Sequence, residues 1–252
     1  MKTWRATYPM LAVLALGGVA ACTDAVAPEL ADLQVAEDLA LSAGDAAAVD
    51  VAELVAAELF GGFAGAPALD GPGSHDLSVT RSRTCYDAQG NVQSQCDRLT
   101  TDSMRIQTTL DGTRQAEHFT AKVHRTRDLT ISGLLGEETS RTHNAVGTAK
   151  DTITMQREGF TRTVRESSVD SIVNVVFNLP HATNPWPVSG QIIRNVNAVI
   201  TITGPREETR TITKRVVVTF PPDAQGNVSI QIGNTTCTLN LVTRRVVNCQ
   251  GS

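Results

Sequence analysis

The stretch CYDAQGNVQSQC, residues 85–96, combines two cysteines with a turn sequence, DAQGNV, that recurs at 223–228. Paired cysteines bind metals, exchange electrons or form disulfides. A structural zinc site spaces its cysteines roughly two to four residues apart, and a thioredoxin-like redox site needs CxxC; this stretch has neither pattern. Asp87 and Asn91 fall short of the about six to eight oxygen ligands of a calcium site and are ordinary turn residues. The repeat therefore predicts two hairpins of the same geometry.

Hairpin geometry predicts a disulfide between Cys85 and Cys96. If Gly90 and Asn91 form a two-residue loop, position 89 pairs with 92 and the two cysteines lie opposite each other. Opposed residues on antiparallel strands lie about 4.5–5.5 Å apart, a separation that a disulfide spans.

Cys237 and Cys249 are predicted to pair by the same argument. A three-residue loop at 242–244 would place Leu241 against Arg245 and the two cysteines against each other. Disulfides are the default for an even number of cysteines in an exported protein, and each closed loop would contribute on the order of 3 kcal/mol.

The N-terminus has the pattern of an export signal. Two basic residues precede MLAVLALGGVAA, an apolar run that is too short to span a bilayer as a helix. The run ends in VAAC at 19–22, which resembles the lipobox of bacterial lipoproteins. The resemblance is confined to residues 1–22. It implies that residues 1–21 are a signal peptide, that Cys22 is acylated, and, from Thr23, an outer-membrane location. An ordinary secretory signal would leave Cys22 as an odd free thiol.

Acidic and basic residues are segregated along the chain. Residues 22–75 contain ten acidic residues and no Lys or Arg, whereas residues 76–252 contain 20 basic and 16 acidic ones. Residues 22–62 are rich in Ala, Leu and Glu and indicate one or two helices, and residues 63–75 form a Gly/Pro-rich linker. The acidic residues are Asp24, Glu29, Asp32, Glu37, Asp38, Asp45, Asp50, Glu53, Glu58 and Asp70.

The acidic segment is either a tether or a docked element. A tether would lift the following domain off the membrane. Leu54, Val55, Leu59 and Phe60 make the segment too apolar for a pure spacer. Docking on the β domain, helped by opposite charge, is therefore the favoured interpretation.

Residues 76–252 are predicted to form an antiparallel meander of about ten to twelve strands. Short stretches rich in Thr, Val, Ile and Arg alternate with period two and are separated by turn signals, without a helix-length pattern that would allow parallel crossovers. In HFTAKVH, residues 118–124, one face is apolar and the other polar. The expected fold is mainly β, a curled half-barrel or a sandwich, preceded by one or two N-terminal helices.

Catalytic motifs are absent from the sequence. It contains no GxSxG, HExxH, P-loop or GxGxxG pattern, and His118 and His124 lie roughly 20 Å apart along an extended strand, too far to share a metal. No cofactor or metal is expected. An enzyme would have to assemble dispersed residues in one cleft with raised carboxylate pKa values. The candidates are Asp128, Glu137, Glu138 and His143.

One loop is a candidate for ligand or partner binding. Residues 178–190, NLPHATNPWPVSG, contain three prolines and the single tryptophan outside the signal. Trp186 would plug the end of the β core or, alternatively, form the rim of a binding site with His181 beside it.

These patterns favour a non-catalytic lipoprotein of the cell envelope with a binding or scaffold domain. It would be attached to the membrane through the lipid on Cys22 and would contact an envelope protein or an apolar ligand. A carrier or chaperone that holds a lipid in the concave sheet is the alternative, and a hydrolase is the third hypothesis. Nucleic acid is excluded as a partner because the Arg-rich strands lack interleaved aromatics and the chain is expected to be exported.

Overall fold

The computed structural model describes Leu54 and residues 74–116, 119–157, 159–181, 183–204, 207–243 and 245–251. The predicted helices of residues 22–62 lie outside this set except for Leu54, which is helical. No helix within the described residues is long and apolar enough to cross a membrane. The strands are β1 (Ser74–Tyr86), β2 (Ser103–Ala116), β3 (Phe119–Ser132), β4 (Ser140–Arg157), β5 (Phe160–Asn178), β6 (Ser189–Thr203), β7 (Glu208–Thr219), β8 (Asn227–Ile232), β9 (Thr235–Asn240) and β10 (Arg245–Gly251).

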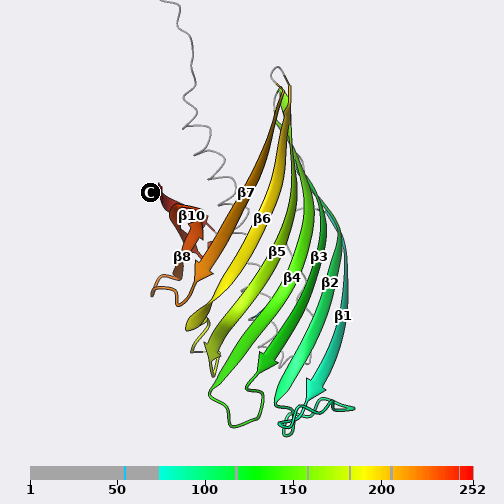
Figure 1. Cartoon of the computed structure of the whole chain (residues 1–252), viewed down its shortest axis with the longest axis vertical. Helices are drawn as coiled ribbons and strands as arrows, with labels where there is room; N and C mark the ends of the chain where they lie inside the picture. Colours follow the sequence, from blue (N-terminus) through cyan, green and yellow to red (C-terminus); the bar gives the residue numbers. More distant parts are fainter. Residues whose placement is uncertain are drawn as a thin grey trace, which may run out of the picture.

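The ten strands form one antiparallel sheet in sequence order, a meander that does not close into a barrel. Figure 1 shows long, strongly curved strands from β1 to β7, which give the sheet a concave side. The predicted mainly-β meander is confirmed, and the single sheet corresponds to the half-barrel alternative and not to the sandwich. We call the concave side the inner face and the opposite side the outer face.

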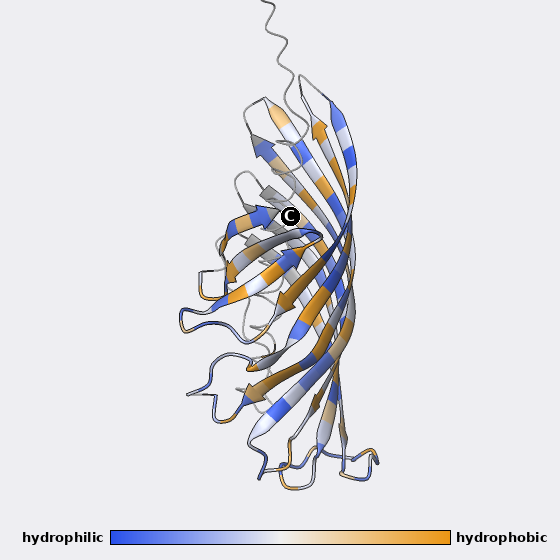
Figure 2. Ribbon diagram, turned by 60° about the vertical axis from the view of Figure 1, so that its left-hand side comes forward, coloured by the Kyte–Doolittle hydropathy of each residue, from blue (hydrophilic) through white to orange (hydrophobic). Residues whose placement is uncertain are grey.

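Alternation along the strands gives the two faces different compositions, which Figure 2 shows as alternating apolar and polar bands. In β3, Ala121 is buried, whereas Lys122 and His124 are exposed, as the sequence predicts. The outer face is rich in threonine. One row of cross-strand neighbours consists of Thr120, Thr154, Thr163, Thr201 and Thr209, on β3 to β7.

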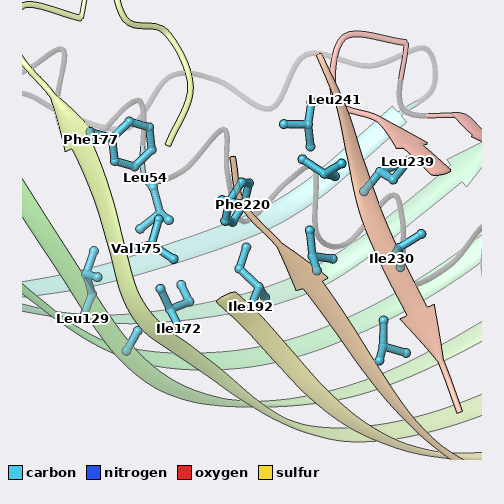
Figure 3. Close-up of a cluster of buried hydrophobic side chains, with 14 of the residues drawn as sticks. Leu54, Leu129, Ile172, Val175, Phe177, Ile192, Phe220, Ile230, Leu239 and Leu241 are labelled. Carbon is cyan, nitrogen blue, oxygen red and sulfur yellow. The ribbon is translucent and has the colours of Figure 1, made fainter. Parts of the chain in front are cut away.

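The core covers the inner face near one end of the strands. Its central row crosses eight strands without a break, because each residue is the Cα partner of the next. Leu54 packs in the same cluster (Figure 3). The row consists of Ile106, Leu129, Ala145, Ile172, Ile192, Val218, Ile230 and Cys237.

A bulge in β5 keeps the core continuous. The register with β4 shifts between His143 and Ala145, and Asn174 adopts a positive φ of 48°. Its N–H donates to Oδ1 of Asn144 at 2.9 Å, which stabilises the irregular backbone. Because the extra residue reverses the alternation, Val175 and Phe177 face the core in place of their even-numbered neighbours.

The two DAQGNV turns share one geometry, as predicted. In the first, Oδ1 of Asp87 accepts hydrogen bonds from the backbone N–H groups of Gln89 and Asn91 at 2.9 and 2.8 Å. In the second, Oδ1 of Asp223 accepts the corresponding two bonds at 2.9 Å each. Gly90 and Gly226 both have a φ of 80°. The Asp side chains therefore act as turn caps.

The predicted register of the first hairpin is wrong, although its cysteines do lie at disulfide distance. Tyr86 pairs with Val92 in a β-bridge, because the turn is longer than the expected two-residue loop. The turn is closed by the hydrogen bond from the N–H of Gly90 to the carbonyl oxygen of Asp87. Cys85 pairs in the sheet with Met104 of β2 instead. Cys96 approaches from the irregular connection that follows, with a Cα–Cα distance of 5.4 Å.

The register of the last hairpin is also corrected, by one residue. Arg245 pairs with Asn240, not with Leu241. The side chain of Asn240 explains the longer loop, because its Oδ1 accepts hydrogen bonds from the N–H groups of Val242 and Thr243 at 3.1 and 2.8 Å. A bulge between positions 247 and 250 then restores the predicted approach of Cys237 and Cys249, whose Cα atoms are 4.0 Å apart.

Candidate functional site

Charged side chains occupy the inner face around and beyond the apolar core. Strand alternation and register place nine cations and four acids with described side chains on this face, a formal excess of five positive charges. The cations are Arg81, Arg83, Arg125, Arg127, Arg141, Arg162, Arg194, Arg210 and Lys214, and the acids are Asp151, Glu166, Asp170 and Glu208.

Asp170 of β5 and Arg194 of β6 form an ion pair at the centre of the sheet. They are directly opposed in the register, and Nε of Arg194 lies 3.0 Å from Oδ1 of Asp170. Their side chains are only 7% and 5% exposed. Apolar residues flank the pair on the same face, Ile172 and Ile192 on one side. Two charges are thus desolvated next to the core.

A second pair joins β3 to β4. The guanidinium of Arg125 donates to Oδ2 of Asp151 at 2.6 Å, and Asp151 is 6% exposed. Gly147 of β4 lies on the same face, as the Cα partner of Asp170. A Cβ atom there would come within 2.6 Å of the carbonyl oxygen of Thr126, so glycine permits the close approach of β3 and β4 where the pairs are placed. We call Arg125, Asp151, Asp170 and Arg194 the charged belt.

The charged belt has a cost that an apolar face would avoid. Desolvating two ions costs several kcal/mol per ion, and their attraction repays this only when the partners are well placed. Replacing such a pair by apolar residues is often neutral or stabilising. The belt is therefore weak evidence for stability.

Ion pairs on the outer face lie in solvent. Arg105 donates through Nε to Oδ1 of Asp128 at 2.7 Å and through a terminal nitrogen to Oδ2, and the side chains are 46% and 29% exposed. The hydrogen bond from Arg105 lowers the pKa of Asp128 below its usual range. His124 and Asp111 also contact each other with both side chains exposed. Such exposed pairs contribute about 0–1 kcal/mol each.

The dispersed residues of the enzyme hypothesis do not come together. Asp128 lies on the outer face, paired with Arg105, whereas His143 is fully buried on the inner face. Glu137 and Glu138 are exposed in the connection between β3 and β4. The lowered pKa of Asp128 is the opposite of the expected rise. In the described part of the chain, no three His, Cys, Asp or Glu residues are placed to hold a metal ion.

The loop that contains His181 and Trp186 lies against the core. Trp186 is half-buried and packs on the hydrophobic cluster. The ring of His181 contacts Phe177 edge-on at 5.2 Å, and Phe177 contacts His143 at 5.3 Å in the same manner. These contacts match the interpretation of Trp186 as the plug of the core end. Cys22 and His118 lie outside the described residues.

Sequence reasoning missed the charged belt, although the sequence contains a signal for it. Asp170 is in phase with Ile172, and Arg194 is in phase with Ile192 and Val196. A charged residue at an apolar position of a central strand indicates a buried pair. Finding the partner, however, requires the strand register.

Comparison of the chain with protein families, curated proteins and solved structures finds no match.

Proposed function

We propose that the protein is a non-catalytic lipoprotein of the bacterial cell envelope and that the inner face of its sheet is a binding surface. The lipobox-like VAAC at 19–22 supports attachment through Cys22. The disulfide pairing of the other four cysteines supports an oxidising compartment.

The composition of the inner face is the observation that carries the proposal. It combines apolar rows, a cationic excess and the largely buried charged belt on one continuous sheet. A face that only stabilised the fold would not need desolvated charges, because apolar residues of the same volume would serve as well. The excess of positive charge on such a face would confer specificity for an acidic partner.

An acidic, amphipathic protein segment fits this face best. Its apolar side chains would contact the core row, and its carboxylates would lie over the arginines. An envelope protein that presents such a segment is therefore the expected class of partner.

A carrier for an apolar ligand is the second candidate, favoured by half-buried apolar side chains toward the far end of the inner face. Ile153, Met155 and Val164 are of this kind. The opposite end is filled by the core cluster around Leu54, so a ligand would have to bind beyond the charged belt.

Face-specific photocross-linking in intact cells tests the proposal. A photoreactive amino acid replaces Val164 on the inner face or its neighbour Arg165 on the outer face of β5. We expect the Val164 probe to capture a discrete protein, whereas the Arg165 probe labels nothing specific. Capture of lipid alone would favour the carrier, and equal labelling from both positions would contradict an inner binding face.

Metabolic labelling tests the anchor. We expect the native chain to incorporate a radiolabelled fatty acid and the Cys22→Ser variant to incorporate none. Labelling of both chains, or of neither, would contradict the lipoprotein assignment.

A further inference from the structure

We propose that the acidic segment of residues 22–62 is the resident occupant of the inner face, latched by Leu54, and that a partner must displace it. The inference rests on the proposed function, because it names the regulation of the same binding face. The segment is part of the chain itself, so binding would be a competition between an internal and an external acidic segment.

Leu54 supplies the first observation. It is 0% exposed and belongs to the core cluster of the inner face. Figure 3 shows its side chain between Phe177 and Val175, at the end of the sheet where the apolar row lies. A leucine that is completely buried on a face made by other strands is an anchor and not a chance contact.

Burial at the centre of the sheet supplies the second observation. Ala198 is 0% exposed, and Arg194 of the charged belt is 4% exposed, although both lie on a face of an open sheet. Among the described residues, Leu54 alone comes from outside the strands and their connections. An open face that is this well buried requires a cover, and the segment that carries Leu54 is the part of the chain available for it.

Charge supplies the third observation. Residues 22–75 carry ten acidic residues and no Lys or Arg. The inner face carries nine described cations against four acids. Opposite charges attract most strongly at low salt, so the segment and the face are complementary in charge as well as in apolar contact.

The connection to the sheet allows the latch to open. Residues 55–73 separate Leu54 from Ser74, where β1 begins. An extended chain of that length reaches roughly 60 Å, so the segment can leave the face without disturbing β1. Residues 63–73 are rich in glycine and proline, which suits a connector and not a strand or helix.

A nicked protein tests the latch directly. The exported chain with Cys22→Ser receives a specific protease site within residues 63–73 and is cut there. Both disulfides lie within residues 85–249, so only non-covalent contacts hold the N-terminal fragment. We expect the fragment to remain bound in native mass spectrometry at 50 mM salt, and its Kd to rise about tenfold at 500 mM salt.

Substitution of the anchor sharpens the test. Leu54→Ala is expected to raise the fragment's Kd at least about 30-fold, because truncation of a core leucine has that effect or more. Val169→Ala, on the exposed outer face, is the matched control and should leave the Kd unchanged. Release of the fragment at low salt from a sheet that keeps its circular dichroism would overturn the latch, as would a Leu54→Ala Kd equal to that of the control.

If the sheet unfolds when the fragment is lost, a peptide added to the uncut protein tests the latch instead. The probe is a fluorescent synthetic peptide of residues 45–62. We expect it to bind the Leu54→Ala chain at concentrations at which it does not bind the native chain. Equal uptake by both chains would contradict a latched face. If the peptide result is negative while the Val164 probe still captures a partner, the latch fails and the binding function stands.

Discussion

Val169 and Val175 belong to the same strand, β5, yet the first is 55% exposed on the outer face and the second is completely buried on the inner face. The same contrast holds for ion pairs. Asp128 meets Arg105 in solvent, whereas Asp170 meets Arg194 between apolar rows. One sheet thus presents the same residue types in two environments. The face on which a residue lies, and not its type, determines whether it is hydrated or buried.

The contrast supports the proposal that the inner face carries the binding specificity. The outer face repeats threonines that suit any exposed strand, and its charges are hydrated. The inner face holds charges at a desolvation cost and receives Leu54 from a distant part of the chain. Interaction with other molecules is therefore expected on the inner face.

The largest expected difference between the faces comes from removing one partner of an ion pair. Asp170→Asn leaves Arg194 buried without its carboxylate and should lower the free energy of unfolding by about 3–5 kcal/mol. Asp128→Asn removes the exposed pair and should cost less than about 1 kcal/mol. Urea denaturation followed by circular dichroism measures both.

Equal losses from these two variants would contradict the difference between the faces. The double variant Asp170→Leu with Arg194→Met supplies the control, because a pair replaced by apolar residues should recover much of the stability that Asp170→Asn loses.

The disulfides are expected to come next in size, because each has one cysteine in the core of the inner face. Cys85 and Cys237 are 1% and 3% exposed. Replacing the pair of Cys237 and Cys249 by serines should lower the free energy of unfolding by about 2–4 kcal/mol. A loss below about 1 kcal/mol in thermal denaturation would show that the last hairpin does not depend on its cross-link.

The two valines give a smaller but better matched comparison. Val175→Ala should cost about 1.5–3 kcal/mol, since it removes buried methyl groups, and Val169→Ala should stay within about 0.5 kcal/mol. Both variants change the same atoms in the same strand. Urea denaturation that gives the same midpoint for both would refute the assignment of the faces.

The smallest effect is the pH dependence of the outer pair. The pKa of Asp128 is lowered by the hydrogen bond from Arg105, so its carboxylate binds a proton less readily in the folded state. The pair therefore stabilises the fold above the unfolded pKa, near 3.8, and this contribution is lost as the pH falls through the folded pKa. In Asp128→Asn the stability should fall less steeply on acidification, by under about 1 kcal/mol. An unchanged acid profile would show that the pair contributes nothing.

Composition and alternation were enough to predict the antiparallel meander and the two faces of HFTAKVH. The cysteine pairs were also predicted, but from hairpin registers that the structure corrects. The registers of the first and last hairpins could not be predicted, because the side chains of Asp87 and Asn240 cap turns that are longer than the expected loops. The bulge at Asn174 and the pairing of Asp170 with Arg194 depend on neighbours far along the chain. No local pattern encodes such partners, although the phase of Asp170 with Ile172 indicated that it would be buried.

Adjacent serines in β5 allow the most direct test of an occluded inner face. Ser168 is buried on the inner face and Ser167 is exposed on the outer face. Serine and cysteine differ little in size, so Ser168→Cys and Ser167→Cys report access by their rates of thiol modification in the Cys22→Ser chain. We expect position 167 to react at the rate of a free thiol and position 168 to react about a hundredfold more slowly. We expect Leu54→Ala to accelerate position 168 alone. Equal rates at the two positions, or no acceleration at 168, would contradict an occluded inner face.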